Sequence, residues 1–122
     1  MVVVDASALA AVLFSEPEGV EVLEALAGDD VAAPATLPFE LTNIARSKTR
    51  QCPDAAAIIQ ANLKDGLLRP IAIVPVDFGE VLDLALKTGL SAYDASHLWL
   101  SRHLSVRLVT LDKKLAAHAK NF

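Results

Sequence analysis

The stretch VVVDASALAAVLF, residues 2–14, decides the fold. Its three consecutive valines leave no polar position, which is typical of a strand buried on both faces. The Ala- and Leu-rich part that begins at Ser7 favours a helix. Asp5 stands between the two. The stretch therefore predicts a strand that leads directly into a helix and has a carboxylate at its carboxyl end.

The rest of the chain alternates short β-branched runs with longer segments rich in Ala and Leu. Strands are expected at residues 2–4, 31–33, 71–76 and 106–111. Helices are expected at residues 7–14, 18–27, 36–50, 53–67, 77–87, 91–103 and 113–120. Strands that are separated by helices favour parallel pairing. The pattern predicts an α/β fold, a three-layer α/β/α sandwich with a central parallel sheet, in a single domain over residues 1–122.

Local spacing predicts the buried faces and the starts of several helices. The apolar residues at helical spacing are Val20, Leu23 and Leu26 in the second helix, and Ala57, Ile58, Ala61 and Leu67 in the fourth. Thr36 is expected to cap the third helix. The pairs Asp77 with Glu80 and Ser91 with Asp94 have the spacing of a capping box.

The composition of the chain excludes several classes of protein. With 53% hydrophobic and 21% charged residues, the chain can fill a core and is not of the disordered class. Aromatic residues make up only 5%, which disfavours a stacking platform for single-stranded bases. A single cysteine, Cys52, forms neither an internal disulfide nor a cysteine-based zinc site.

The opening residues match neither a membrane span nor a signal peptide. The apolar run at residues 8–14 is far shorter than the ~18 residues of a membrane-spanning helix. No basic residue precedes this run, and Asp5 interrupts the apolar residues before it. We therefore expect a cytoplasmic protein with no membrane segment.

Charge is distributed unevenly along the chain. The formal net charge is −4, yet residues 1–45 contain eight acidic residues and no Lys or Arg, while all eleven Lys and Arg lie in residues 46–122. A net negative charge taken alone disfavours binding to nucleic acid. The uneven distribution nevertheless permits a local basic patch.

Four acidic residues are expected at one edge of the predicted sheet. Asp5 ends the first strand and Asp112 follows the last, while Glu40 and Asp94 lie in the first turns of helices that should begin near the same edge. Ligands of such sheets bind beyond the carboxyl ends of the strands. Taken singly, each acid has an alternative role, as a helix cap or as a negative charge at a positive helix end.

The four acids together favour a metal site. Carboxylates that share a pocket repel one another unless a cation neutralises them. Oxygen ligands with no His or Cys expected nearby suggest Mg²⁺ or Mn²⁺, which can activate water for displacement at phosphorus. The hydroxyls of Ser7 and Thr110 stand two residues from Asp5 and Asp112, close enough to orient a carboxylate. Asn43 shares a helix face with Glu40 and could form a hydrogen bond with it.

Four blocks of this sequence resemble the motifs of PIN-domain ribonucleases: VVVDASALAAVL, PFELTNIAR, LSAYDASHLWLSR and LVTLDKKL. The resemblance covers essentially the whole chain and is strongest to the VapC-type toxins of toxin–antitoxin pairs. Residue by residue, the acidic quartet of the family falls on Asp5, Glu40, Asp94 and Asp112. The supporting polar positions fall on Ser7, Asn43 and Thr110.

The resemblance implies an endoribonuclease that uses Mg²⁺ or Mn²⁺ and leaves a 5′-phosphate and a 3′-hydroxyl. It also implies a homodimer and a cognate antitoxin, whose C-terminal segment enters the active site. Candidate RNA contacts are Arg46, Lys48 and Arg50 on the helix of Glu40, and Lys113 and Lys114 beside Asp112. His97 departs from the family, where many relatives have Tyr. It is expected to be a packed side chain and not a general base, and an RNA contact is the alternative.

Three alternatives are open at this point. A PIN-like module that only binds a partner would have lost catalysis, and a nuclease of the same chemistry could act on DNA. A phosphoacceptor receiver domain is also an α/β sheet of this length. It is disfavoured because Asp5 has no acidic neighbour and residues 53–68 look helical where the receiver has its central strand.

Overall fold

The computed structural model describes residues 1–120 and contains every strand and helix that the sequence predicts. The strands are β1 (Val2–Val4), β2 (Val31–Ala33), β3 (Ile71–Ile73) and β4 (Leu108–Val109). The helices are α1 (Ala6–Leu13), α2 (Gly19–Leu26), α3 (Leu37–Gln51), α4 (Ala56–Leu67), α5 (Phe78–Thr88), α6 (Ala92–Leu104) and α7 (Lys113–Lys120), with a short 3₁₀ helix, η1 (Pro53–Ala55), before α4. Within the described residues, no helix is both long and apolar enough to cross a membrane.

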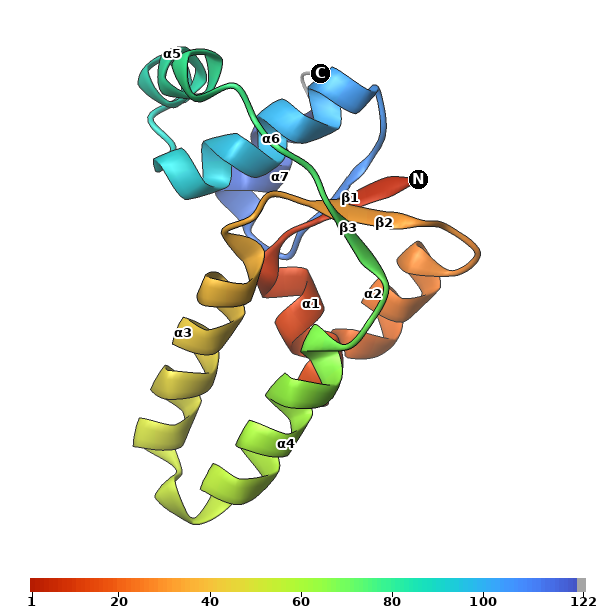
Figure 1. Ribbon diagram of the computed structural model, residues 1–122, viewed down its shortest axis with the longest axis vertical. Helices are drawn as coiled ribbons and strands as arrows, with labels where there is room; N and C mark the ends of the chain where they lie inside the picture. Colours follow the sequence, from red (N-terminus) through yellow and green to blue (C-terminus); the bar gives the residue numbers. More distant parts are fainter. Residues whose placement is uncertain (121–122) are drawn as a thin grey trace.

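The four strands form one parallel sheet in the order β3-β2-β1-β4. Because β1 lies between two neighbours and under two layers of helices, all three of its valines are buried. Val4 packs toward α1 and α3, whereas Val3 packs beside Leu100 of α6. Helices α1 to α4 cover one face of the sheet and α5 to α7 the other (Figure 1). The predicted three-layer α/β/α sandwich is confirmed.

The two edge strands are shorter than expected. β3 ends at Ile73 because its neighbour β2 offers only three residues for pairing, and Pro75 has no N–H to donate. One further bond, from Val74 N to the Ala33 carbonyl (3.0 Å), closes this pairing. β4 spans two residues because β1 turns into α1 directly beyond it.

The buried faces of α2 and α4 differ from the predicted ones. In α2, Gly19 and Val22 are buried, whereas Val20 and Leu23 are 64% and 48% exposed. Of the predicted α2 positions, only Leu26 packs partly against the core. The reason is that α2 lies close against α1, which leaves room for the backbone at Gly19 but not for a larger side chain.

In α4 the buried stripe is Ile59, Leu63 and Gly66, which lies on α1 and α3. The predicted face was Ala57, Ile58, Ala61 and Leu67, and all four are exposed. Ile58 and Ile59 are adjacent, so two apolar stripes compete along this helix. The fit between Gly66 and the side chain of Leu13 selects one of them.

Replacing Gly19 with Ala should destabilise the protein. A Cβ at this position would lie 2.6 Å from the Ala11 carbonyl oxygen, so α2 must move away from α1. We expect a loss of about 1–3 kcal/mol in the free energy of unfolding, the usual cost of overpacking. Urea unfolding should show a lower midpoint with an unchanged slope.

Gly79 in α5 provides the matched control, since a Cβ there meets nothing closer than 3.4 Å. Gly79→Ala should be neutral or stabilise the protein by up to about 1 kcal/mol, because Ala favours a helix more than Gly does. Equal effects of the two substitutions would show that the α1–α2 contact does not limit stability.

Candidate active site

Asp5 is the buried centre of the acidic site. It follows β1 at the carboxyl end of the strand and is only 4% exposed. Its Oδ1 caps α1 by accepting a hydrogen bond from Ala8 N (3.0 Å) and accepts a second from Ser7 Oγ (2.8 Å). Its Oδ2 accepts a hydrogen bond from Thr110 Oγ1 (2.5 Å). Three donors therefore hold this carboxylate in one orientation.

The two hydroxyls are themselves held by the backbone that follows β4. Leu111 N donates to Ser7 Oγ (3.0 Å), and Asp112 N donates to Thr110 Oγ1 (3.0 Å). Each hydroxyl thus accepts from the backbone and donates to Asp5. Ser7 supports the neighbouring Asp5, as the sequence suggested, whereas Thr110, which the sequence placed beside Asp112, donates across 105 residues to Asp5.

Glu40 lies in the first turn of α3 and is half-buried. Its Oε1 accepts a hydrogen bond from Thr36 Oγ1 (2.8 Å). Two expectations about this helix are wrong. Thr36 occupies the N-cap position of α3, but its side chain makes no capping hydrogen bond, because its hydroxyl donates to Glu40 and its backbone is already helical. Asn43 is exposed, and no hydrogen bond joins it to Glu40 in the described structure, because Thr36 takes that place.

Asp94 and Asp112 lie at the starts of two other helices. Asp94 is half-buried in the first turn of α6, and its backbone N donates to the capping hydroxyl of Ser91 (3.1 Å). Asp112 is exposed and caps α7, its Oδ1 accepting a hydrogen bond from Leu115 N (2.9 Å). The capping role that the sequence left open as an alternative is therefore real for both Asp5 and Asp112.

The four acids interact electrostatically. Burial raises the pKa of Glu40 above its ordinary value, and the negative charges of Asp5 and Asp94 add to this, while His97 and the Thr36 hydroxyl oppose it. Burial also raises the pKa of Asp94, and Asp112 and Asp5 raise it further. The ends of β1 and β4 and the starts of α3 and α6 thus place four mutually repelling carboxyl groups in one region.

The donor chemistry of this region fits a hard divalent cation, because four carboxylates supply only oxygen. The raised pKa values of Glu40 and Asp94 fit as well, since a cation would relieve the repulsion that contributes to them. Among residues 1–120, however, no group of three or more His, Cys, Asp or Glu side chains lies close enough together to hold a metal ion as the side chains stand. The site is an open group of carboxylates, which a shared ion would draw together.

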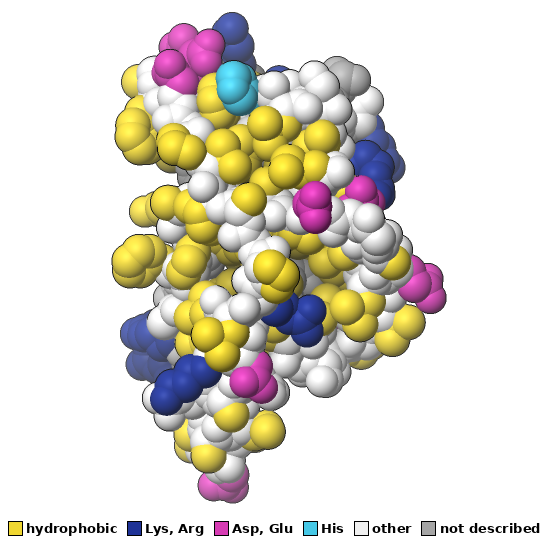
Figure 2. All heavy atoms as spheres, turned by 45° about the vertical axis from the view of Figure 1, so that its right-hand side comes forward, with side chains coloured by type: hydrophobic (Ala, Val, Ile, Leu, Met, Phe, Trp, Pro, Cys, Tyr) yellow, Lys and Arg dark blue, Asp and Glu magenta, His cyan; other side chains and the backbone are white. Residues whose placement is uncertain are grey.

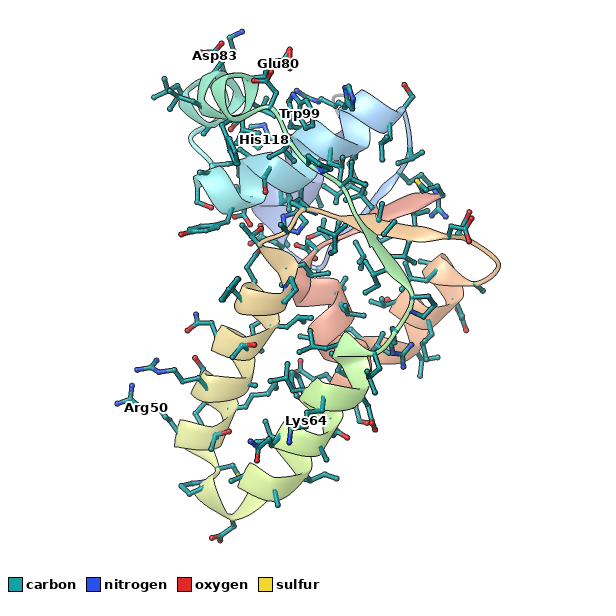
Figure 3. All side chains as sticks on the ribbon, viewed as in Figure 1. Arg50, Lys64, Glu80, Asp83, Trp99 and His118 are labelled. Carbon is teal, nitrogen blue, oxygen red and sulfur yellow. The ribbon has the colours of Figure 1, made fainter. Side chains whose placement is uncertain are left out.

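The basic residues on α3 lie in the part of the helix that follows Glu40. Lys48 forms an ion pair with Glu16 and lies over the Phe14 ring, 5.6 Å from its centroid. Arg50 projects from the far part of α3, away from α4 (Figure 3). Arg46, two residues before Lys48, is exposed. The ion pair of Lys48 makes it a poor candidate for contact with RNA.

Lys114 is a basic residue whose charge acts on the acidic site. Its Nζ donates to the Gly89 carbonyl (3.1 Å), and its charge lowers the pKa of Asp94. Lys113 is exposed beside Asp112. Lys114 was predicted as an RNA contact beside Asp112, but its place near Asp94 could not be predicted, because nothing in the sequence placed α7 against the turn between α5 and α6.

His97 is fully buried, as the sequence analysis expected of a packed side chain. Its Nδ1 lies 2.9 Å from the Tyr93 carbonyl oxygen, and its Nε2 lies 3.8 Å from Glu40 Oε1. The expectation that no His lies near the acids is therefore wrong, because α3 and α6 meet only in the folded chain.

The family model of the PIN domain matches residues 2–121. The chain belongs to the PIN-domain family. Among solved structures, this PIN domain is similar to PAE2754 from Pyrobaculum aerophilum, with 28% identity and a TM-score of 0.79 over 98% of this chain and 79% of that one. It is also similar to Mycobacterium tuberculosis VapC20, described as a toxin that cleaves the sarcin-ricin loop, with 16% identity and a TM-score of 0.67 over 97% and 95% of the two chains. No curated protein matches the chain.

Membership of the PIN-domain family confirms the resemblance and excludes the receiver-domain alternative. PIN domains are a family of nucleases, and its members generally use divalent metals. The acids of this PIN domain lie where its parallel strands end, which is where an α/β sheet binds its ligands.

Replacing Asp94 with Asn should stabilise this PIN domain at neutral pH. Because folding raises the pKa of Asp94, its ionised form opposes folding above that raised pKa, and this penalty disappears as the pH falls toward 3.8, the ordinary value. At about pH 7 we expect Asp94→Asn to gain up to about 1 kcal/mol in the free energy of unfolding, since water screens a half-buried charge. Urea unfolding without divalent ions, repeated at decreasing pH, measures the gain.

Asp83→Asn is the control, because Asp83 lies on the exposed side of α5 (Figure 3). Its free energy of unfolding should stay within about 0.5 kcal/mol of wild type at every pH. If both variants gain equally, the effect comes from the lower net charge and not from repulsion among the site carboxylates.

Proposed function

We propose that this PIN domain is a Mg²⁺- or Mn²⁺-dependent endoribonuclease, the VapC-type toxin of a toxin–antitoxin pair that acts in the cytoplasm. The observation that carries the proposal is the buried, triply hydrogen-bonded carboxylate of Asp5, with three more acids acting on one another around it. The nuclease chemistry of the family and the likeness of the fold to a toxin that cleaves an RNA loop support it.

Asp5, Glu40 and Asp94 would hold the metal ion, and Asp112 would complete the site directly or through water. A divalent ion bound there supplies an activated water and a positive charge that stabilises the attacked phosphate. Asp5 gives this site a fixed point, because its three hydrogen bonds leave its carboxylate no freedom to turn. Glu40 and Asp94 adjust around it, and the products would carry a 5′-phosphate and a 3′-hydroxyl.

The RNA backbone would be held by the basic residues that face solvent near the site. Lys114 is our first candidate, since its charge already acts on Asp94. Lys113 and Arg46 are exposed and follow it. Lys48 is a weaker candidate for RNA contact than these residues, because it forms an ion pair with Glu16. Such contacts with phosphate orient the RNA and do not read its sequence.

Asp5→Asn should abolish cleavage of RNA. The amide cannot supply the second negative oxygen, and the loss of even an outer-shell partner of a metal typically costs about 10–100-fold. We expect a decrease of more than about 100-fold in the rate at which labelled RNA is cleaved in Mg²⁺ or Mn²⁺. Asn remains a good helix cap, so the fold should be retained.

Asp77→Asn is a matched control. Asp77 caps α5 through its Oδ1 as Asp5 caps α1, but it belongs to none of the site contacts. This variant should cleave RNA at the wild-type rate. Wild-type cleavage by Asp5→Asn, or cleavage that survives removal of metal by EDTA, would refute the proposal. A wild-type protein that binds RNA without cutting it would favour the alternative of an inactive binding module, and cleavage of DNA instead of RNA would change the substrate.

We also propose a homodimer, with a cognate antitoxin whose C-terminal segment enters the acidic site. Hydrophobic side chains are spread over much of the face in Figure 2. Three large ones follow one face of α5 at intervals of four residues: Phe78, Leu82 and Leu86 are 83%, 58% and 75% exposed. A monomer seldom exposes such a stripe, and a twofold dimer would cover it with its own copy.

Leu86→Lys should convert the dimer to a monomer, because a charged group would then lie in the apolar contact. Light scattering at micromolar concentration measures the mass of both proteins. Ile58→Lys on α4, where the wild-type residue is 59% exposed, should leave the dimer intact. A monomeric wild type would remove the proposed dimer, and dissociation only by Ile58→Lys would place the interface on α4.

A further inference from the structure

Only one of the two ring nitrogens of His97 has a hydrogen-bond partner among the described residues. The other, Nε2, lies near Glu40 of the acidic site. The ring is fully buried in α6. Its Nδ1 lies 2.9 Å from the Tyr93 carbonyl oxygen, which can only accept a hydrogen bond. Nδ1 therefore carries the proton, and in the neutral ring Nε2 presents a lone pair.

The Nε2 lone pair is directed toward Glu40. Nε2 is buried, has no hydrogen-bond partner among residues 1–120, and lies 3.8 Å from Glu40 Oε1. A neutral ring and an ionised carboxylate both offer lone pairs across this gap. A proton there would make the contact an ion pair, and a metal ion there would bind both groups. A buried polar atom without a hydrogen-bond partner lowers the stability of the fold by about 1–3 kcal/mol. A ligand bound to Nε2 would remove this cost.

The arrangement of His97 is the usual one for a metal-binding histidine. Such a residue typically donates its other N–H to a carbonyl or carboxylate, which fixes the tautomer and the ring. Two donors about 2.1 Å from one ion stand about 3.0–3.4 Å apart at octahedral or tetrahedral angles. The observed 3.8 Å is about 0.4 Å longer than the tetrahedral separation and about 0.8 Å longer than the octahedral one, so a bound ion would draw the two groups together. Thr36 already fixes the Glu40 side chain beside the ring through the same Oε1.

We propose that Nε2 of His97 is a nitrogen ligand of the divalent ion in the acidic site, alongside Glu40, and that it gives the site a preference for Mn²⁺ over Mg²⁺. The inference rests on the proposed metal-dependent function and adds a ligand outside the acidic quartet. Mg²⁺ favours oxygen ligands and retains its waters. An imidazole ligand instead raises the affinity of a site for divalent transition metals such as Mn²⁺ relative to Mg²⁺. The ring thus selects among ions that four carboxylates alone would accept.

Pulsed EPR of Mn²⁺ bound to the wild-type protein tests this directly. A directly bound ring nitrogen gives a ¹⁴N hyperfine coupling, which should change to that of ¹⁵N when the histidines are ¹⁵N-labelled. The coupling should vanish in His97→Phe and persist in His103→Phe, whose exposed ring only stacks on Trp99 of the same helix. If His97→Phe fails to fold, the labelled wild type still shows whether a histidine binds Mn²⁺, and a coupling that persists in both His103→Phe and His118→Phe assigns it to His97.

Affinities for the two ions provide the second measurement. Titration calorimetry should show about 10-fold or greater loss of Mn²⁺ affinity in His97→Phe, the usual scale for a perturbed metal site, with less than about 3-fold change for Mg²⁺. The ratio of the two affinities should be unchanged in His103→Phe.

Two outcomes would overturn the inference in different ways. If Mn²⁺ binds, binding requires Asp5, and no nitrogen coupling is found, the carboxylates alone hold the ion; His97 is then not a ligand, and the proposed nuclease stands. If Mn²⁺ does not bind even to the wild type, both this inference and the proposed metal-dependent function are wrong.

Discussion

The arrangement of this molecule depends on the burial of one carboxylate where two parallel strands end. Burying a charged carboxylate costs several kcal/mol unless donors replace the water it loses. Asp5 obtains them from Ser7 and Thr110, whose hydroxyls are in turn held by the backbone just after β4. The donors come from opposite ends of the chain, so Asp5 is satisfied only when β1 and β4 are paired. Closure of the sheet and assembly of the site are therefore the same event.

Helix starts explain why the fold tolerates four acids in one region. Each of the four lies at or near the N-terminus of a helix, where the unpaired N–H groups and the helix dipole favour negative charge. Asp5 and Asp112 accept hydrogen bonds from these N–H groups and so have a structural role as well as a chemical one. Glu40 and Asp94 accept none from their helices, and burial and repulsion raise the pKa of both. The capping and metal-binding interpretations of the sequence are thus complementary, with two acids fixed and two adjustable.

The sequence predicted the elements, the parallel sheet and the region of the acids, because hydrophobic runs and helix starts are local signals. The sequence did not predict which of two adjacent apolar residues is buried, as with Ile58 and Ile59. Only the packing of α1 against α4 determines that Ile59 is buried and Ile58 is exposed. The sequence also missed contacts made across the fold, such as the bond of Thr110 to Asp5 and the ring of His97 beside Glu40. These partners lie on or next to different elements, and spacing along the chain has no information about them.

The charge distribution constrains how an acidic protein can bind RNA. The first 45 residues contain no Lys or Arg, and the strands and helices they form build half of the site. Without a cation, the four carboxylates repel the phosphates of any substrate as well as one another. A bound divalent ion reverses the sign of that interaction locally, and a phosphate in turn adds oxygen ligands to the ion. Ion and RNA should therefore each raise the affinity for the other by the same factor, as linkage requires. Lys114, whose Nζ donates to the Gly89 carbonyl, adds a positive charge that acts on Asp94. This charge would also attract the phosphates of a bound RNA.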